Sequence, residues 1–315
     1  AAAGLYDGDV LHLRPRDDQL PLADFDDLVD GVHTGLSART DSWRPALTRR
    51  ACVGLAALSG LLAVLVTAFA GTGTTTAISA AAVGLVLICG GSVVARLLDD
   101  RGAAVTLGAV GVVAVGVAGL AMPAGAAGPT AWLTGAGVLA CAVAVATAAA
   151  AARVVLGAAR AGFLAVTCGG SLTALGCVVG LLFGLDAHAT SAVIVAMVLA
   201  VTRAAPQLAA WLTGLGAEPV PTTPEEFQQN LDPLPSKDVL DRAALADAHL
   251  TAFMIALGAV CSAALLVLTT RFEWDTIALS LVVAVLLLSQ ARELRGTWHR
   301  LAALTPAAAA LIAVL

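Results

Sequence analysis

Nine long apolar segments occupy most of the chain from Arg50 onward, and short polar stretches separate them. They cover residues 51–70, 77–95, 103–122, 131–152, 161–184, 192–212, 250–269, 276–290 and 301–315. A bilayer core about 30 Å thick is crossed by about 20 apolar residues in helical conformation. The pattern therefore predicts an all-α polytopic membrane protein with nine transmembrane helices.

The sixth and ninth segments depart from the simple pattern. The sixth contains Arg203 and Pro206, so we interpret it as a helix that reaches the membrane surface near Arg203 and continues to Trp211 along the interface. The ninth, residues 301–315, extends only about 22 Å at 1.5 Å per residue, which is too short for a full crossing. We expect the native chain to continue beyond Leu315.

Composition agrees with this interpretation. Hydrophobic residues make up 59% of the 315 positions, and charged residues only 12%. The mean hydropathy is +0.91. Soluble domains carry about 25% charged residues, so the composition excludes an ordinary globular enzyme.

The positions of the basic residues predict the orientation of the helices. With nine spans and a cytoplasmic amino terminus, 16 of the 17 lysines and arginines fall on the cytoplasmic side, and Arg271 alone falls outside. Cytoplasmic loops of membrane proteins carry such an excess. Tryptophan favours the membrane interface, and all five tryptophans lie at expected ends of spans: Trp43, Trp132, Trp211, Trp274 and Trp298.

Two polar regions are expected in the cytosol. In the first, residues 10–14 alternate like a short strand, which needs partner strands, so residues 1–22 predict the tail of a larger cytosolic domain. Residues 23–50 form an amphipathic linker to spans 1–6, which end at residue 212. The second polar region, residues 213–249, is a proline-rich loop followed by a short amphipathic helix that leads into spans 7–9, residues 250–315.

The spans lack the residues that catalysis or ion coupling requires. Apart from Arg203, no ionisable side chain other than cysteine lies inside an expected span, whereas ion-coupled transporters need such groups near the middle of the membrane. No GxxxxGK[ST] phosphate loop is present. His188 and Asp186 share a short external loop but are too few for a metal site. All six cysteines fall in apolar runs, which favours packing over disulfides. We expect no catalytic residue, metal or cofactor.

Gly176, Gly180 and Gly184 are spaced four residues apart in the fifth span. Small residues at this spacing allow two helices to approach closely. In a chain with 31 glycines the spacing also arises by chance. Packing within the chain and dimerisation between chains therefore both remain open.

Three short motifs and the order of the spans resemble EccD, the polytopic membrane subunit of the type VII (ESX) secretion system. The motifs are DGDVLHLRP at residues 7–15, FDDLVD at residues 25–30 and PVPTTPEEF at residues 219–227. The resemblance covers essentially the whole chain. It implies that residues 1–22 are the remnant of a ubiquitin-like domain and that a full chain has eleven transmembrane helices.

The resemblance also implies a function and partners. A member of this family is a non-catalytic scaffold in the bacterial plasma membrane with a cytoplasmic amino terminus. Two copies associate in each protomer around a lipid-filled space, together with an EccC ATPase of the FtsK/SpoIIIE type and with EccB and EccE subunits. The motifs then make seven residues candidates for partner docking: Phe25, Asp26, Asp27, Pro221, Glu225, Glu226 and Phe227.

Two other functions remain as alternatives. A permease for a neutral or apolar solute does not require charge inside the membrane, but it predicts an inverted repeat, and none is visible by inspection. A membrane enzyme acting on lipids requires a polar catalytic cluster at the interface, and the sequence contains no such cluster.

Overall fold

The computed structural model describes residues 45–70, 73–124, 134–214, 236–271, 273–294 and 296–314, and within these residues all regular structure is helical. The helices are α2 (Pro45–Ala70), α3 (Gly73–Leu97), α4 (Arg101–Ala121), the short 3-10 helix η1 (Met122–Ala124), α5 (Gly135–Leu156), α6 (Arg160–Leu182), α7 (Ala187–Leu212), α9 (Ser236–Leu268), α10 (Trp274–Glu293) and α11 (Thr297–Val314). The prediction of an all-α fold is confirmed for the described part of the chain.

Eight of these helices, α2 to α10, are long and apolar enough to cross a membrane. The last, α11, has 18 residues and corresponds to the short ninth segment. The polytopic membrane fold is thus confirmed, and helix bounds lie within about six residues of the expected spans except at the start of α9. The strand at residues 10–14, the ubiquitin-like remnant and the helical linker fall outside the described residues.

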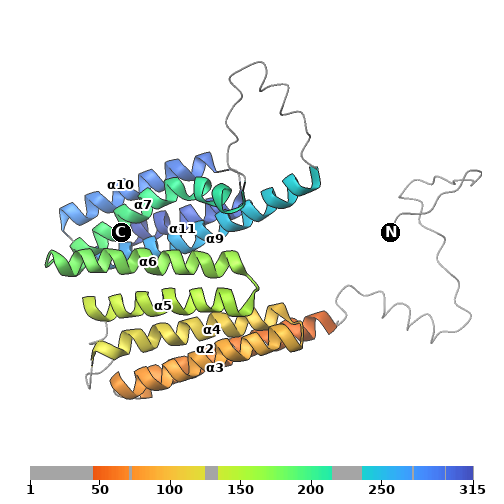
Figure 1. The fold of residues 1–315 in the computed structure, drawn as a ribbon. Coiled ribbons are helices and arrows are strands. Elements are labelled where there is room, and N and C mark those ends of the chain that lie inside the picture. Colours follow the sequence, from red (N-terminus) through yellow and green to blue (C-terminus); the bar gives the residue numbers. More distant parts are fainter. Residues whose placement is uncertain are drawn as a thin grey trace, which may run out of the picture. The chain divides into compact units, whose positions relative to one another are not determined.

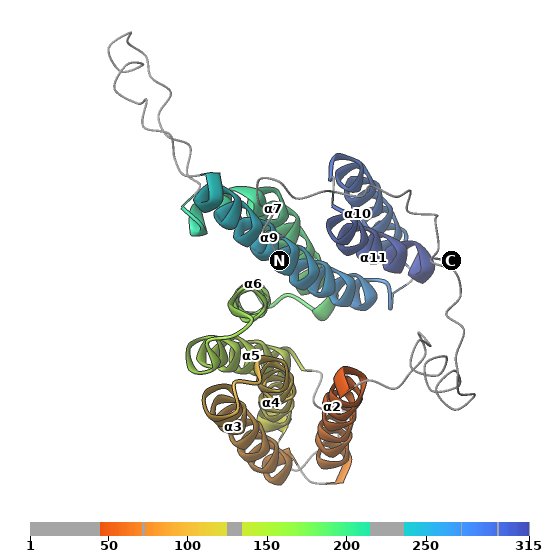
Figure 2. The ribbon, with the colours of Figure 1, turned by 90° about the vertical axis from the view of Figure 1, so that its right-hand side faces the viewer.

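The chain separates into two units, Ala1–Cys52 and Val53–Leu315. Within the second unit the helices run back and forth (Figure 1). Viewed along the bundle, α3, α4 and α5 lie on one side of α6, and α7, α9, α10 and α11 lie on the other (Figure 2). Because α6 contacts α5, α7 and α9, it joins the two groups.

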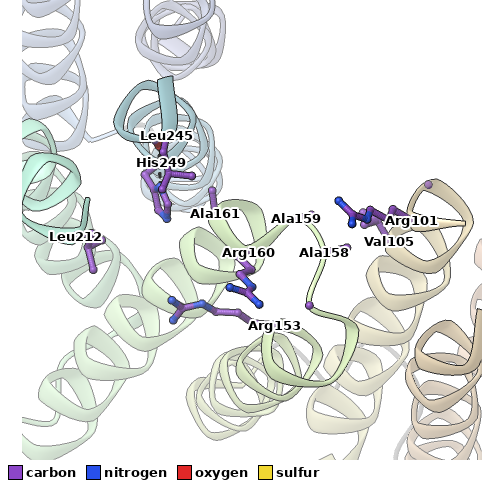
Figure 3. Close-up of a pocket in the computed structure, with 12 residues that line it drawn as sticks. Arg101, Val105, Arg153, Ala158, Ala159, Arg160, Ala161, Leu212, Leu245 and His249 are labelled. Carbon is purple, nitrogen blue, oxygen red and sulfur yellow. Dashed lines mark hydrogen bonds between the residues drawn. The ribbon is translucent and has the colours of Figure 1, made fainter. Parts of the chain in front are cut away.

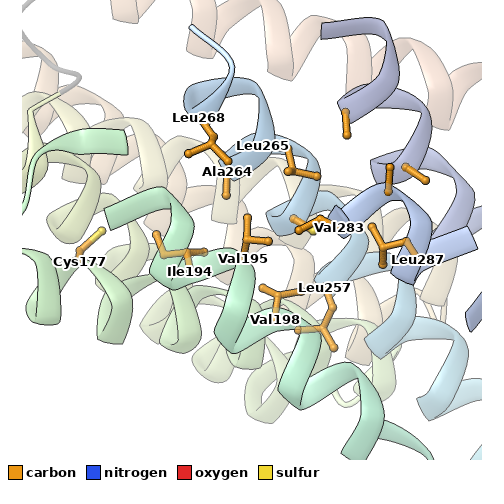
Figure 4. Close-up of a cluster of buried hydrophobic side chains, with 14 residues drawn as sticks. Cys177, Ile194, Val195, Val198, Leu257, Ala264, Leu265, Leu268, Val283 and Leu287 are labelled. Carbon is orange, nitrogen blue, oxygen red and sulfur yellow. The ribbon is translucent and has the colours of Figure 1, made fainter. Parts of the chain in front are cut away.

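The group formed by α7, α9, α10 and α11 is held together by aliphatic side chains. Leu265 of α9 is fully buried, and Val195 and Val198 of α7 are each 1% exposed. They belong to one cluster with Leu257, Val283 and other residues of α6, α7, α9, α10 and α11 (Figure 4). These side chains interdigitate across the helices and fill the space between them.

Glycine governs the contacts among α3, α4, α5 and α6. A Cβ atom on Gly84 of α3 would lie 2.7 Å from the carbonyl oxygen of Gly111 on α4, and one on Gly111 would lie 2.8 Å from that of Gly84. Gly119 and Gly170 meet α5 backbone carbonyls in the same way, at 2.7 and 3.0 Å. Each pair of helices therefore approaches so closely that only a hydrogen atom fits between the backbones.

The ends of several helices follow from single residues. Asp100, Thr134 and Asp186 precede α4, α5 and α7, and their side chains accept hydrogen bonds from backbone N–H groups three residues later. Helix α5 ends at Gly157, whose φ of 64° is left-handed and suits glycine.

Helix α9 differs from the sequence expectation in one respect. The amphipathic segment after the proline-rich loop and the seventh span form a single helix of 33 residues, Ser236–Leu268. No glycine or proline occurs between Ser236 and Leu257, so nothing in the sequence breaks the helix where the apolar run begins. At 1.5 Å per residue the helix is about 50 Å long, about 20 Å more than a bilayer core requires.

Candidate functional site

Charge in the second unit is collected at the ends of the helices. Because the helices alternate in direction, the basic residues described there gather at the end where α3 stops and α4 starts, which we call the basic end. They are Arg96, Arg101, Arg153, Arg160, Arg203, Lys237, Arg242, Arg292 and Arg300, while Arg271 follows α9 at the opposite end. The bundle interior between the two ends carries no charged side chain in the described spans.

Arg203 is the basic residue placed farthest inside an expected span. Its side chain is 62% exposed, and its Nη1 atom lies 3.6 Å from Oε2 of Glu293, the last residue of α10. Helix α7 continues past Arg203 and Pro206 to Leu212. The arginine thus sits near the basic end with an acidic partner, which explains how this span tolerates it.

A polar cluster links α7 to the end of α9 at the opposite end of the bundle. Asp186 accepts hydrogen bonds from Ala189 N–H at 2.8 Å and from Arg271 Nη1 at 2.7 Å. His188 Nε2 lies 2.9 Å from Thr270 Oγ1. The Ala189 N–H, opposed by a smaller desolvation effect and aided by Arg271 and His188, holds the pKa of Asp186 below its usual range.

The composition of this cluster indicates a structural role, in which polar side chains link two helices. Among the described residues no group of three or more His, Cys, Asp or Glu side chains is arranged to hold a metal ion. Asp186 instead pairs with Arg271 and so connects α7 to the end of α9, while the buried Nδ1 atom of His188 lies 3.7 Å from Asp186 Oδ2 and has no hydrogen-bond partner among the described residues.

The glycines of α6 face two different environments. Gly176 and Gly180 are buried, and a Cβ atom on them would collide with Ile194 and Thr190 of α7, respectively. Gly184 follows the end of α6 with φ of 62°, and no atom lies within 4 Å of its Cβ position. In this chain, Gly176 and Gly180 therefore allow α6 and α7 to pack closely.

The seven residues expected to dock partners lie outside the described residues. The structure does describe the helix that follows them. On the first turns of α9, Val239 is 38% exposed, Leu240 68% and Leu245 50%. These apolar side chains extend past the membrane-length part of α9 among charged neighbours.

The structure also brings together residues that the sequence indicates only as topology markers. Arg101, Arg153 and Arg160 line one cavity at the basic end, together with His249 (Figure 3). They come from α4, α5, α6 and α9, which are separated by up to 148 positions. Only the folded arrangement of the four helices brings them around one space.

Comparison with known proteins gives a consistent picture. The family model of the EccD-like transmembrane domain matches residues 48–315. No curated protein matches the chain.

Two solved structures share its fold. A chain of the MycP5-free ESX-5 inner membrane complex in State II superposes with a TM-score of 0.70 at 19% identity, over 95% of this chain and 70% of that chain. A chain in protomer 1 of the ESX-3 core complex gives 0.65 at 20% identity, over 97% of this chain and 69% of that chain.

Proposed function

The chain belongs to the EccD-like transmembrane family, and from this premise we propose that it is a scaffold subunit of a type VII (ESX) secretion complex. The observation that carries the proposal is the family match over residues 48–315, which includes every span. In this role the protein performs no catalysis. It holds other subunits together in the bacterial plasma membrane.

The distribution of charge supports a scaffold over an ion-coupled transporter. A coupling ion needs an ionisable group that it can reach inside the membrane, and the described spans keep their charged side chains at the helix ends. The interior is occupied by close helix contacts and aliphatic packing, which suit a rigid framework.

We infer that the basic end faces the cytoplasm, which also places the amino terminus there. Positively charged residues are retained on the cytoplasmic side during insertion, and nine of the ten described in the second unit lie at this end. Fusing a reporter that is active only in the cytoplasm after α7 and after α9 tests the orientation. Activity only for the fusion after α7 supports it, and the reverse pattern contradicts it.

The partners follow from the family and remain part of the proposal. They are an EccC-type ATPase, EccB-type and EccE-type subunits, membrane lipids and a second copy of this chain. Helix α2 has the smallest buried share of the eight candidate spans, 11%, so most of its surface is available to lipid or to a neighbouring subunit.

We propose that the cytosolic partners dock on the linker around residues 25–27, on the loop around residues 221–227 and on the exposed start of α9. Leu240 supports this role for α9, because an apolar side chain that is 68% exposed above the membrane is stabilised when a partner covers it.

Replacing residues 216–235 with a glycine and serine linker of equal length tests the docking proposal. We expect the chain to reach the membrane normally, because its spans are untouched, and the secretion complex to be lost on a native gel. Replacing residues 125–133, which connect η1 to α5, in the same way is the control and should leave the complex intact. An intact complex with the first replacement contradicts docking on the loop.

A further inference from the structure

The cavity at the basic end has a volume of about 800 Å³. Its walls come from the starts of α4 and α6, the ends of α5 and α7, and the α9 turns around His249 (Figure 3). These are the positions at which the apolar runs begin or end. The cavity therefore lies at the depth where lipid headgroups meet the hydrocarbon core.

Three guanidinium groups line this space. In Figure 3, Arg101 points across the opening toward Arg153 and Arg160. No aspartate or glutamate is among the lining residues, and none of the salt bridges within the described part of the chain involves these three arginines. The cavity thus carries positive charge that a phosphate group, with its several acceptor oxygens, is suited to neutralise.

The backbone adds further donors. Helix α6 begins at Arg160, and the residue before it, Ala159, provides no side-chain hydrogen bond to the first turn. The first turn borders the cavity through Arg160 and Ala161, so its N–H groups lie at the cavity wall without a side-chain cap, at the positive end of the helix dipole. At α4, by contrast, the Asp100 side chain caps the first turn.

His249 provides an independent indication of a ligand. Its side chain is 8% exposed, and its Nδ1 atom lies 2.8 Å from the carbonyl oxygen of Leu245. A carbonyl only accepts, so Nδ1 carries the hydrogen and Nε2 is left for another partner. Among the described residues Nε2 has no such partner, although the residue borders the cavity.

The apolar part of the wall identifies the kind of phosphate. Val105, Ala161, Leu212 and Leu245 line the same space as the arginines. A free phosphate ion gains nothing from them, whereas the glycerol and upper acyl carbons of a lipid do. We propose that the cavity binds the phosphate headgroup of an anionic phospholipid, with its acyl chains extending along the helices into the bilayer.

Native mass spectrometry of the full chain tests this assignment. The protein is reconstituted in bilayer discs of phosphatidylcholine with a minor fraction of phosphatidylglycerol and then released in mild detergent. We expect phosphatidylglycerol to be retained in preference to phosphatidylcholine. The cavity lies within a single chain, so the result does not depend on assembly with partners.

The arginines are tested by a matched pair of variants with equal charge change. In R153Q/R160Q, retention of phosphatidylglycerol should fall roughly twenty-five-fold, because each basic residue near a membrane surface contributes about fivefold to anionic lipid binding. The control R203Q/K237Q removes two exposed charges at the same end of the bundle, outside the cavity, and should retain the lipid.

Two further variants keep the test informative if R153Q/R160Q does not fold. R153K/R160K preserves the charge and should preserve most of the retention. R101Q changes an exposed residue at the start of α4 and should lower retention about fivefold.

Three outcomes overturn the assignment. One is an equal loss of lipid in R153Q/R160Q and its control, which shows that retention depends on the net surface charge and not on the cavity. Another is displacement of the lipid by an equal concentration of inorganic phosphate, which shows that the apolar wall adds no affinity and assigns the cavity to a free anion. The third is a severalfold rise in retention when residues 216–235 are replaced by a neutral linker, which assigns it to the acidic loop.

Discussion

The two helix groups on either side of α6 are built on different packing principles (Figure 2). In the first, α3, α4 and α5 approach until glycine meets backbone, as Gly84 and Gly111 do. In the second, α7 and α9 to α11 pack mainly through interdigitating Leu and Val side chains around Leu265, although Gly258 of α9 also meets the Ala302 carbonyl oxygen of α11. Both groups pack as helical bundles, so a membrane protein does not require either mode of helix packing.

The two kinds of packing predict which substitutions each group tolerates. Lipid tails are as apolar as leucine, so burying a side chain between helices yields little hydrophobic free energy, and close contact must supply the stability. Contact through glycine is lost when volume is added. Contact through leucine is lost when volume is removed. The first group should be sensitive mainly to larger residues and the second mainly to smaller ones, except at Gly258.

The largest effect is expected from Gly111→Val. The new Cβ would lie 2.8 Å from both the Gly84 carbonyl oxygen and Ile88 Cγ1, so α3 and α4 must separate. We expect a loss of about 3 kcal/mol or more in unfolding free energy, measured in mixed micelles. Gly90→Val is the control, since no atom lies within 4 Å of its Cβ position. Equal stability of the two variants would show that the helices do not meet at Gly111.

A smaller loss is expected from Leu265→Ala. The residue is fully buried, so its truncation leaves a cavity. The side chain is surrounded by apolar groups both in the folded protein and in the micelle-bound unfolded chain, so its truncation loses no hydrophobic transfer free energy. Only the cavity contributes, and we expect about 1–2 kcal/mol in the same unfolding assay. Leu266, which is 53% exposed, gives the control Leu266→Ala. A larger loss for Leu266 would contradict the position of the core.

Gly180→Ala should be milder still. The three atoms nearest its Cβ position all belong to the Thr190 side chain, whose Oγ1 and Cγ2 can rotate away, so we expect about 1 kcal/mol. The same variant distinguishes packing within the chain from dimerisation. Packing against α7 predicts an unchanged oligomeric state in size-exclusion chromatography with light scattering. A shift to monomer without loss of stability would favour dimerisation through Gly180.

The smallest effect is expected from Asp186→Asn at the start of α7. The group is exposed, so the melting temperature should fall by no more than about 2 °C at neutral pH. The pKa of Asp186 is lower in the folded protein, so its contribution is present above the unfolded pKa and is lost as the pH falls through the folded pKa. Melting curves of the two proteins should converge in that acidic range. A constant difference would exclude the carboxylate charge as the cause.

Much of this fold follows from the sequence, because an apolar run of about 20 residues has few alternatives to a membrane helix. Trp211, Trp274 and Trp298 also lie at helix ends, as their interfacial preference predicts. The seventh span was harder to predict, since the apolar run starts near Leu250 whereas the helix begins at Ser236. Hydropathy marks only the part of a helix that lies in the membrane, whereas the helix itself continues until a residue such as glycine or proline interrupts it.

The sites were less predictable than the helices. Spacing alone does not tell which of 31 glycines meets a backbone, because it does not give the rotation of each helix about its axis. The cavity at Arg153 and Arg160 likewise depends on which helix ends become neighbours. A useful signal was present in Ala159, a residue without a capping side chain before a helix that begins with arginine.

Affinity purification of the tagged chain from its own cells in mild detergent tests whether it is a scaffold subunit. A scaffold subunit of a type VII complex should bring down an FtsK-type ATPase and smaller membrane subunits in fixed proportions. Purification of the chain alone, together with transport of a neutral solute into liposomes by that pure protein, would contradict the scaffold function and favour a permease.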